Sequence, residues 1–262
     1  MTEKAILLSK IEKKSICVLT LNNPVNRNPL SIELIDNLQK KFNEIKKDNT
    51  IKVVVLKSTG PSFSSGHDLK EVSKYSKSSK KLNLLFNKCS KMMLSIRSLP
   101  QPVIASIDGL AAAAGCQLVA SCDLAIASSS SYFQTPGVNI GLFCSTPMVA
   151  ISRKVLPKDM MSMLLTGEML KANDAKKISL INLVVKKNSL KKETMEIAYK
   201  ISNKSFQSIK IGKIAFYKQL DMPIEKAYEY TSKIMTKNMQ NKDAKEGITA
   251  FIEKRNPIWS KK

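Results

Sequence analysis

The amino-acid sequence predicts an α/β protein with a helical C-terminal region. Two observations support this prediction. Short β-branched runs alternate with segments of helical periodicity over residues 1–195, whereas residues 196–262 show only helical patterns. At 262 residues the chain is long enough to bury a substantial core. We therefore expect two regions, an α/β core over 1–195 and a helical region over 196–262.

The first hundred residues alternate strand and helix patterns. "SICVLTLN" (15–22) alternates as a strand does, and "SIELIDNLQKKFNEIKKD" (31–48) has apolar residues at helical spacing, with Ser31 as the N-cap. "IKVVVLKS" (51–58) is typical of a strand buried on both faces. "KLNLLFNKCSKMMLSIRSL" (81–99) predicts a long helix that ends before Pro100.

The alternation continues and then gives way to helices. We expect a strand at 103–109, an Ala-rich helix at 113–122, a strand at 123–128 and helices at 158–166 and 172–179. From about residue 190 onward, four successive segments have helical periodicity. These patterns complete the predicted α/β core and helical C-terminal region.

Two small-residue turns each follow a buried strand and open a helix. They are "FSSGHDLKE" (63–71) and "IDGLAAAAGCQL" (107–118). The unpaired N–H groups at a helix start, together with the positive end of the helix dipole, suit such a turn to hold an anion. The two turns could converge on one oxygen atom.

The net charge of +22 raises the question of nucleic-acid binding. Only four of the 43 basic residues are arginines, and arginine is the side chain that forks onto bases and phosphates. The lysines are scattered, and no aromatic residues interleave with them as on a stacking platform. This pattern favours a solvated lysine-rich surface, which could still steer an anionic small molecule.

Cysteine usage and the apolar runs bound the class of protein further. The five cysteines form no C-x-x-C pair and the chain has a single histidine, so we expect no metal site. No apolar run reaches the length of a membrane helix. The start, "MTEKAILLSK", shows neither a secretory signal nor a mitochondrial transit pattern, which favours a reducing compartment.

Five segments, in order along nearly the whole chain, resemble motifs of the crotonase (enoyl-CoA hydratase/isomerase) superfamily. They are "NPVNRNPLS" (23–31), "FSSGHDL" (63–69), "PVIASIDGLAAAAGCQLVASCDLAIAS" (102–128), "FQTPGVNIGLFCST" (133–146) and "EGITAFIEKRNPIW" (246–259). The resemblance implies a spiral of ββα repeats with a C-terminal helical region that builds trimers, commonly paired into hexamers. It also implies an acyl-CoA substrate, with coenzyme A bound only as part of it, and a mitochondrial location, with a cytoplasmic one as the alternative.

The resemblance assigns two backbone donors. In this family the thioester carbonyl lies between two N–H groups that stabilise an enolate oxygen, and by position these belong to His67 and Ala114. Asp68 is expected to cap a helix or brace the turn, and Asp123 to be structural.

The same resemblance shows that the family's acid positions hold no carboxylates. The two hydratase glutamates fall on Gln117 and Gly137, and a third acid of some isomerases and hydrolases falls on Ser145. Hydration needs an acid and a base near the enoyl group, and none of these residues supplies one. Standard hydratase activity is therefore not expected.

Three functional hypotheses follow from the absence of these carboxylates. The chain could bind acyl-CoA with little or no hydration. It could catalyse a reaction for which enolate stabilisation nearly suffices, such as decarboxylation of a malonyl-type CoA or an isomerisation. A different side chain could transfer the proton, with Cys144, Ser145, Asn139 and the His67 imidazole as candidates.

The resemblance also suggests contacts for CoA. Arg27, Lys70 and Lys254 are candidates for its phosphates, and Asn28, Asp68 and Leu69 lie in the corresponding turns. Phe251 could pack near the adenine or in the core. One superfamily relative binds RNA, so an RNA-binding homologue is the alternative from another class; its binding would fall steeply with salt.

Overall fold

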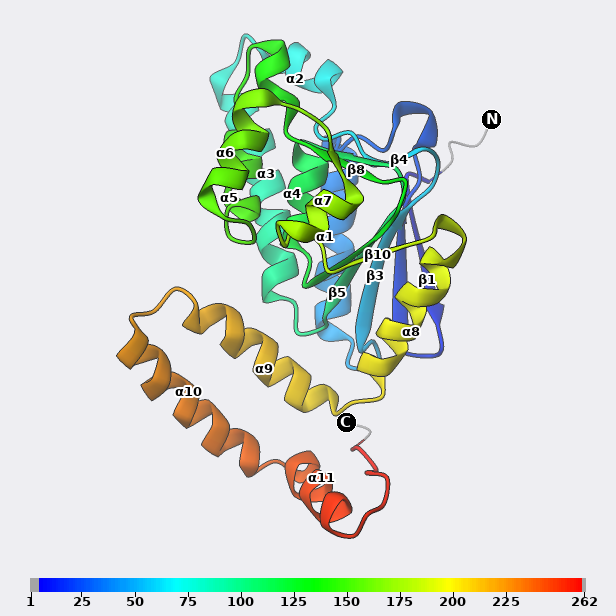
Figure 1. The fold of residues 1–262 in the computed structure, drawn as a ribbon, viewed down its shortest axis with the longest axis vertical. Coiled ribbons are helices and arrows are strands. Elements are labelled where there is room, and N and C mark those ends of the chain that lie inside the picture. Colours follow the sequence, from blue (N-terminus) through cyan, green and yellow to red (C-terminus); the bar gives the residue numbers. More distant parts are fainter. Residues whose placement is uncertain (1–4, 261–262) are drawn as a thin grey trace.

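The structure is a computed structural model that describes residues 5–260. It confirms the α/β prediction and contains two sheets (Figure 1). The six-stranded sheet has the order β1-β2-β3-β5-β7-β10, parallel except for the β1–β2 pair. Its strands are β1 (Leu7–Glu12), β2 (Ile16–Leu21), β3 (Val53–Ser58), β5 (Val103–Ile107), β7 (Leu124–Ser128) and β10 (Leu183–Val185).

A second sheet of four short strands was not predicted. Its order is β4-β6-β8-β9, with β4 at Ser62–Ser64, β6 at Leu110–Ala112, β8 at Tyr132–Gln134 and β9 at Leu170–Lys171. Strands of two or three residues are too short to show a period, so they leave no recognisable pattern in the sequence. In the first two repeats a long strand leads to a short strand and then a helix, β3-β4-α2 and β5-β6-α4, as the ββα prediction requires.

Helices cover both faces of the large sheet. One face carries α1 (Ile32–Lys47), α3 (Ser79–Ser98) and α4 (Ala114–Ser121), whose apolar side chains join the main core. The other face is covered by α8 (Leu190–Ser202), which packs on β2, β3, β5 and β7. Because both faces are covered, strands β2 and β5 are buried at every position, which is why their sequences are mostly apolar.

The remaining helices connect the strands or close the ends of the fold. At the start of α1, Ser31 is the N-cap as predicted, because its Oγ accepts a hydrogen bond from the Leu34 amide at 3.2 Å. The connecting helices are η1 (Pro24–Asn26), α2 (Leu69–Tyr75), η2 (Pro136–Ile140), α5 (Ser145–Ile151), α6 (Pro157–Thr166), α7 (Ala172–Lys177) and η3 (Lys187–Ser189). No helix among residues 5–260 is both long and apolar enough to cross a membrane.

The C-terminal helices form an arm that extends from the α/β body (Figure 1). The arm consists of α9 (Phe206–Gln219), α10 (Ile224–Met239) and α11 (Lys242–Ile252). It confirms the prediction that this end of the chain is helical. The boundaries proposed at 195 and 196 fall inside α8, which packs on the body, so the arm itself begins near residue 205.

Candidate functional site

The two small-residue turns of the sequence lie in direct contact. Gly66 has φ +93°, and a Cβ on it would lie 3.0 Å from the Ala112 carbonyl oxygen and 3.2 Å from the Ala114 nitrogen. Glycine alone combines this conformation with so close an approach. The turn that carries His67 is thereby held against the start of α4.

A second glycine fixes the same contact from the other side. A Cβ on Gly115 would lie only 2.3 Å from the carbonyl oxygen of Ser64, a backbone atom of β4. The β4–β6 pair aligns Ser64 with Ala111 and so places both turns at one end of the small sheet. The first turn of α4 therefore packs directly on the backbone that leads to His67.

The backbone N–H groups of His67 and Ala114 are free to donate to a ligand atom. His67 forms a parallel bridge with Leu30, but the donor in that bridge is the Leu30 amide, which binds the Gly66 carbonyl at 2.7 Å. Ala114 is the first residue of α4, where an N–H has no acceptor within the helix. Within residues 5–260, neither amide donates a hydrogen bond.

The residue before α4 has a strained backbone. Ala113 has φ +48°, which is uncommon for a residue with a side chain. Hydrogen bonds hold it there, since its amide donates to the Gln134 carbonyl at 2.9 Å and its carbonyl accepts from the Gln117 amide at 3.0 Å. Backbone strain of this kind is concentrated at functional sites.

The imidazole of His67 has no fixed orientation from hydrogen bonds. The ring is half-buried and meets the Phe86 ring edge-on, with centroids 5.3 Å apart. Neither ring nitrogen has a hydrogen-bond partner among the described residues. Burial lowers the pKa of His67, and the nearby Leu30 carbonyl opposes that shift only in part, so the neutral form of the ring is favoured.

Of the three positions expected to lack carboxylates, Gln117 faces a cavity. Its side chain is 4% exposed, its Oε1 has no hydrogen-bond partner within the described residues, and it lines a pocket of about 720 Å³. Gln117 lies one turn after Ala114 on α4. A buried amide oxygen without a partner is costly, which points to a ligand or water beside it.

The other two positions have different surroundings. Gly137 is buried in η2, where a Cβ would lie 3.0 Å from both the Cys144 Sγ and the Leu142 carbonyl oxygen. A glutamate at 137 would therefore require this loop to move. Ser145 is exposed at the start of α5, and its Oγ donates to the Phe143 carbonyl at 3.4 Å.

The remaining proton-transfer candidates gain little support. Burial raises the pKa of the Cys144 thiol, which disfavours the thiolate that nucleophilic attack requires. Asn139 is exposed and its side chain lies against Gly167. Neither residue lines the pocket that contains Gln117.

The predicted CoA-contacting turn is bound to the His67 turn. The carbonyl of Arg27 accepts a hydrogen bond from the Ser65 amide at 3.0 Å, and the Arg27 side chain is exposed. Asn28 is fully buried. Its Oδ1 accepts from the Asn23 amide at 2.7 Å and its Nδ2 donates to the carbonyls of Thr59 and Ser62. The Asn28 side chain thus braces this turn and is not available to CoA.

Asp68 has the capping role expected for it. Its Oδ1 accepts from the amides of Lys70 at 2.8 Å and Glu71 at 3.4 Å, which fixes the start of α2. Leu69 and Lys70 follow on α2 with exposed side chains. This end of α2 is the part of the surface next to His67.

Lys254 and Phe251 do not join this site within one chain. They lie at the end of α11, at the opposite end of the molecule from α2 (Figure 1). Phe251 is 85% exposed, so the expectation that it packs in the core is wrong. Both residues could meet CoA only if another copy of the chain supplied them.

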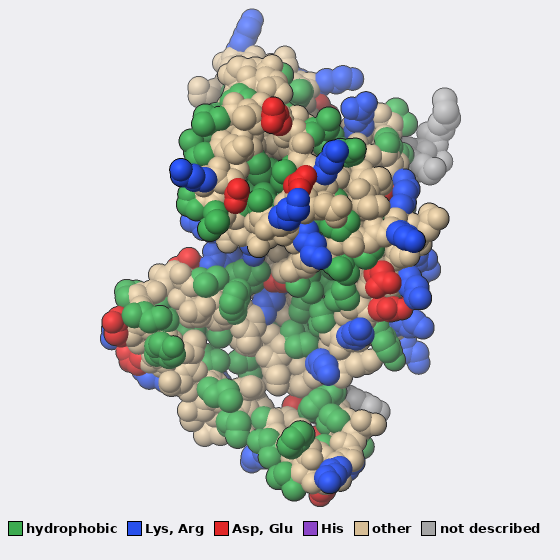
Figure 2. Space-filling model, viewed as in Figure 1, with side chains coloured by type: hydrophobic (Ala, Val, Ile, Leu, Met, Phe, Trp, Pro, Cys, Tyr) green, Lys and Arg blue, Asp and Glu red, His purple; other side chains and the backbone are tan. Residues whose placement is uncertain are grey.

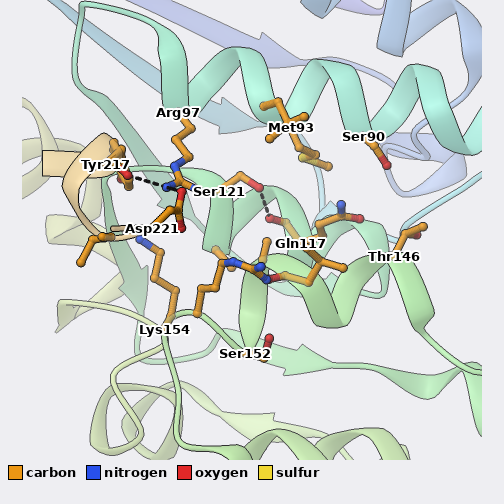
Figure 3. A pocket seen from close by; sticks show the side chains of 16 residues that line it. Ser90, Met93, Arg97, Gln117, Ser121, Thr146, Ser152, Lys154, Tyr217 and Asp221 are labelled. Carbon is orange, nitrogen blue, oxygen red and sulfur yellow. Dashed lines mark hydrogen bonds and ion pairs between the residues drawn. The ribbon is translucent and has the colours of Figure 1, made fainter. Parts of the chain in front are cut away.

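The pocket beside Gln117 includes residues that sequence reasoning missed. It lies between α3, α4, α5 and α9, and Figure 3 shows Arg97, Tyr217, Asp221 and Lys154 gathered at one side of it. Of the residues that line it, only Gln117 was singled out from the sequence. Nothing local in the sequence relates α9 to α3, which precedes it by more than a hundred residues.

Stacked ββα repeats, with two touching turns that present free amides, define a protein of the crotonase fold. A statistical model described as enoyl-CoA hydratase/isomerase matches residues 11–262. The chain belongs to this enoyl-CoA hydratase/isomerase family.

Curated proteins and solved structures agree with this assignment. The chain is 48% identical over 242 residues to human "Enoyl-CoA hydratase domain-containing protein 3, mitochondrial", with 92% of this chain and 80% of that protein covered. It is 31% identical to the "Short-chain-enoyl-CoA hydratase" of Clostridium acetobutylicum, with 95% of each covered.

The solved structures match over almost the whole chain. A crystal structure of an enoyl-CoA hydratase from Mycobacterium smegmatis superposes with a TM-score of 0.96 at 42% identity, covering 98% of this chain and 99% of that one. The crystal structure of human enoyl Coenzyme A hydratase domain-containing protein 3 gives 0.94 at 45% identity, covering 97% and 100%. The ββα spiral is therefore confirmed.

Proposed function

We propose that this protein binds an acyl-CoA thioester and holds the thioester oxygen between the amides of His67 and Ala114. The observation that carries the proposal is the contact of the two turns through Gly66, together with the absence of an acceptor for either amide among the described residues. Such donors stabilise the negative charge that develops on a thioester oxygen when an enolate forms. The names of the hydratase relatives support CoA thioesters as the substrate class.

Standard hydration of an enoyl-CoA is not part of this proposal. Gln117 and Gly137 carry no group that takes up or releases a proton near pH 7, and Ser145 is exposed and outside the pocket. The chemistry that remains is enolate stabilisation. Loss of carbon dioxide from a malonyl-type thioester fits it, because the breaking carbon–carbon bond leaves its electron pair to the enolate, which then takes a proton from water.

The arm supports a proposal of self-association. Large apolar side chains on α9, α10 and α11 are exposed in the single chain, and Figure 2 shows such side chains along this part of the surface. They include Phe216, Leu220, Ile224, Tyr228, Met235, Ile248, Phe251 and Ile252. Extended apolar surface of this kind marks protein–protein contacts. A trimer or hexamer would cover it and could bring Lys254 of one copy to the CoA site of another.

The lysine-rich surface and the relatives bear on two further points. On the face shown in Figure 2 the basic side chains are scattered and form no continuous stripe, which gives no support to nucleic-acid binding. Relatives named as mitochondrial support a mitochondrial location for this chain, which we include in the proposal.

The experiment compares His67→Pro with His67→Ala. Proline removes the backbone N–H, so we expect a loss of about 10²–10³-fold in turnover, or in affinity for an enolate analogue. Alanine keeps the N–H and removes only the ring, so it should change little. Circular dichroism of both variants checks that each is folded.

A panel of enoyl-, malonyl- and hydroxyacyl-CoA substrates identifies the reaction. We expect no appreciable hydration of crotonyl-CoA by the wild-type protein, and rapid hydration would contradict the proposal. Equal losses in His67→Pro and His67→Ala would instead assign the function to the imidazole.

A further inference from the structure

The pocket beside Gln117 has apolar walls and a charged end. Met93 and Leu94 of α3 and Val149 of α5 give its walls an apolar character. At the side shown with Tyr217 in Figure 3, Arg97 and Lys154 reach the cavity. An acyl chain entering past Gln117 would therefore lie on apolar side chains and end near cations.

The charges at this end do not cancel. Arg97, Arg153 and Lys154 carry positive charge, whereas Asp221 is the only acidic residue that lines the pocket within residues 5–260. Asp221 pairs with Arg97, with 2.7 Å between its Oδ2 and the guanidinium Nη2. The Arg153 guanidinium donates to the Val149 carbonyl, which leaves its charge uncompensated.

Lys154 has no carboxylate partner among the described residues. Its side chain is half-buried and its Nζ lies 5.5 Å from the centre of the Tyr217 ring. Tyr217 itself donates a hydrogen bond to Asp123 at 2.9 Å, which fixes the ring in place. A half-buried ammonium group over an aromatic ring, with no counter-ion, is an attractive position for an anion.

The Arg97–Asp221 pair can also yield to a ligand. The Asp221 side chain is 65% exposed and lies just beyond the end of α9, so it can move into solvent. A ligand carboxylate would then take its place on a guanidinium that matches carboxylate geometry. Among the described residues, the pocket thus offers two cations without a carboxylate partner, Arg153 and Lys154, and a third, Arg97, whose partner is exchangeable.

We infer that this pocket is a subsite for acyl groups with a carboxylate at the end remote from the thioester. The substrate class is then the CoA thioesters of dicarboxylic acids, with Lys154 and Arg97 binding the free carboxylate. This inference rests on the proposed function, because it takes the thioester to lie at His67 and Ala114. Gln117, which lies one turn after Ala114 on α4 and lines the same pocket as Lys154 and Arg97, relates the two ends.

The test measures binding of matched acyl-CoA pairs by calorimetry. Each pair has the same number of carbons, and one member ends in a methyl group and the other in a carboxylate. We expect the carboxylate member to bind about tenfold more tightly, or better, at one preferred chain length, since a charge-assisted contact contributes about that factor. A general attraction to the basic surface would instead favour the carboxylate equally at every length and would weaken with salt.

Three variants sharpen the test. Lys154→Met should remove most of the carboxylate preference while leaving methyl-ended partners unchanged. Lys158→Met removes the same charge from an exposed position on α6 outside the pocket, and should have no effect. Asp221→Asn frees Arg97 from its partner and should increase the preference.

The possible failures are distinguishable. Binding of methyl-ended acyl-CoA without any carboxylate preference would overturn the inference and leave the proposed function standing. Equal weakening of both members by Lys154→Met would show that this end of the pocket holds the phosphates of CoA and would also overturn it. Failure of every acyl-CoA to bind would overturn the proposed function together with the inference.

Discussion

The α/β body and the C-terminal arm bury their side chains in different ways. Strands β2 and β5 of the body are buried at every position, whereas the arm helices bury little beyond Ala215, Ala227 and Ala250. The body therefore contains its own core. The arm exposes its larger apolar residues and so has little core of its own. Its stability therefore depends on the contacts at its two ends and on any partner that covers it.

One contact between the two regions is a buried ion pair. Lys213 of α9 reaches into the body, where its Nζ donates to Asp123 at 2.6 Å and to the carbonyls of Ile96 and Gln101. Asp123 also accepts from the Val103 amide at 2.7 Å and from the Tyr217 hydroxyl. Burial lowers the pKa of Lys213 and Asp123 opposes that shift. The arm is thus attached through polar contacts at the N-terminal ends of strands β5 and β7.

The largest effect should come from breaking this attachment. Lys213→Met leaves Asp123 buried without its cation, and removing one partner of a buried pair typically costs about 3–5 kcal/mol. We expect the free energy of unfolding to fall by that amount in chemical denaturation, with α9 becoming accessible to protease first. Lys210→Met is the matched control, because Lys210 has no carboxylate partner among the described residues. Equal stability of the two variants would show that the pair does not hold the arm.

A smaller change in stability is expected from two helical glycines, Gly115 in the packed body and Gly212 in the exposed arm. Gly115→Ala places a Cβ 2.3 Å from the Ser64 carbonyl, so we expect a loss of about 1–3 kcal/mol. The strain should also separate the two amides and abolish acyl-CoA binding. In α9, a Cβ on Gly212 meets nothing within 4 Å, so Gly212→Ala should stabilise by about 1 kcal/mol.

Thermal unfolding and acyl-CoA titration of the two variants measure this contrast. Unchanged acyl-CoA affinity in Gly115→Ala would show that the contact with Ser64 does not set the site. Destabilisation by Gly212→Ala would show that a partner already covers this face of α9. The arm would then be packed more like the body than the single chain indicates.

The sequence predicted the body better than it predicted the arrangement of the arm. The stretch 51–58 reads as a nearly continuous apolar run because its strand is buried on both faces, and the structure confirms it as β3. The helices of the arm were equally evident, yet nothing in their periodicity shows which face is left without a partner. That depends on contacts of α9 with residues far away in the sequence, such as Asp123.

The candidate site was predictable only in part for the same reason. The two small-residue turns were evident in the sequence, and the family resemblance assigned His67 and Ala114 within them. The structure shows why the turns need glycine, because their backbones approach closely. The role of Asn28 as a brace and the pocket residues Lys154 and Tyr217 were not evident. Their positions depend on long-range packing, which leaves no local pattern.

The smallest effect concerns the far end of the arm and its response to acid. Arg255 donates to Glu246 through two guanidinium nitrogens, at 2.6 and 3.0 Å, and the Ile258 amide donates at 2.8 Å. These hydrogen bonds lower the pKa of Glu246 to about 2. Because the value in the folded chain lies below the usual value of about 4.3, the contact stabilises fully above that pH and is lost as pH falls towards 2.

We therefore expect the Ile258 amide to lose protection from hydrogen exchange in acid, whereas the buried body strands retain theirs until lower pH. Glu246→Gln should expose this amide at neutral pH with little change in overall stability, since the pair lies on the surface. Glu229→Gln is the control, because Glu229 pairs only with Lys226 and Lys233 of its own helix. A protected Ile258 amide in Glu246→Gln would mean that the end of the arm is held by apolar packing, so that it resembles the body more closely than its exposed surface indicates.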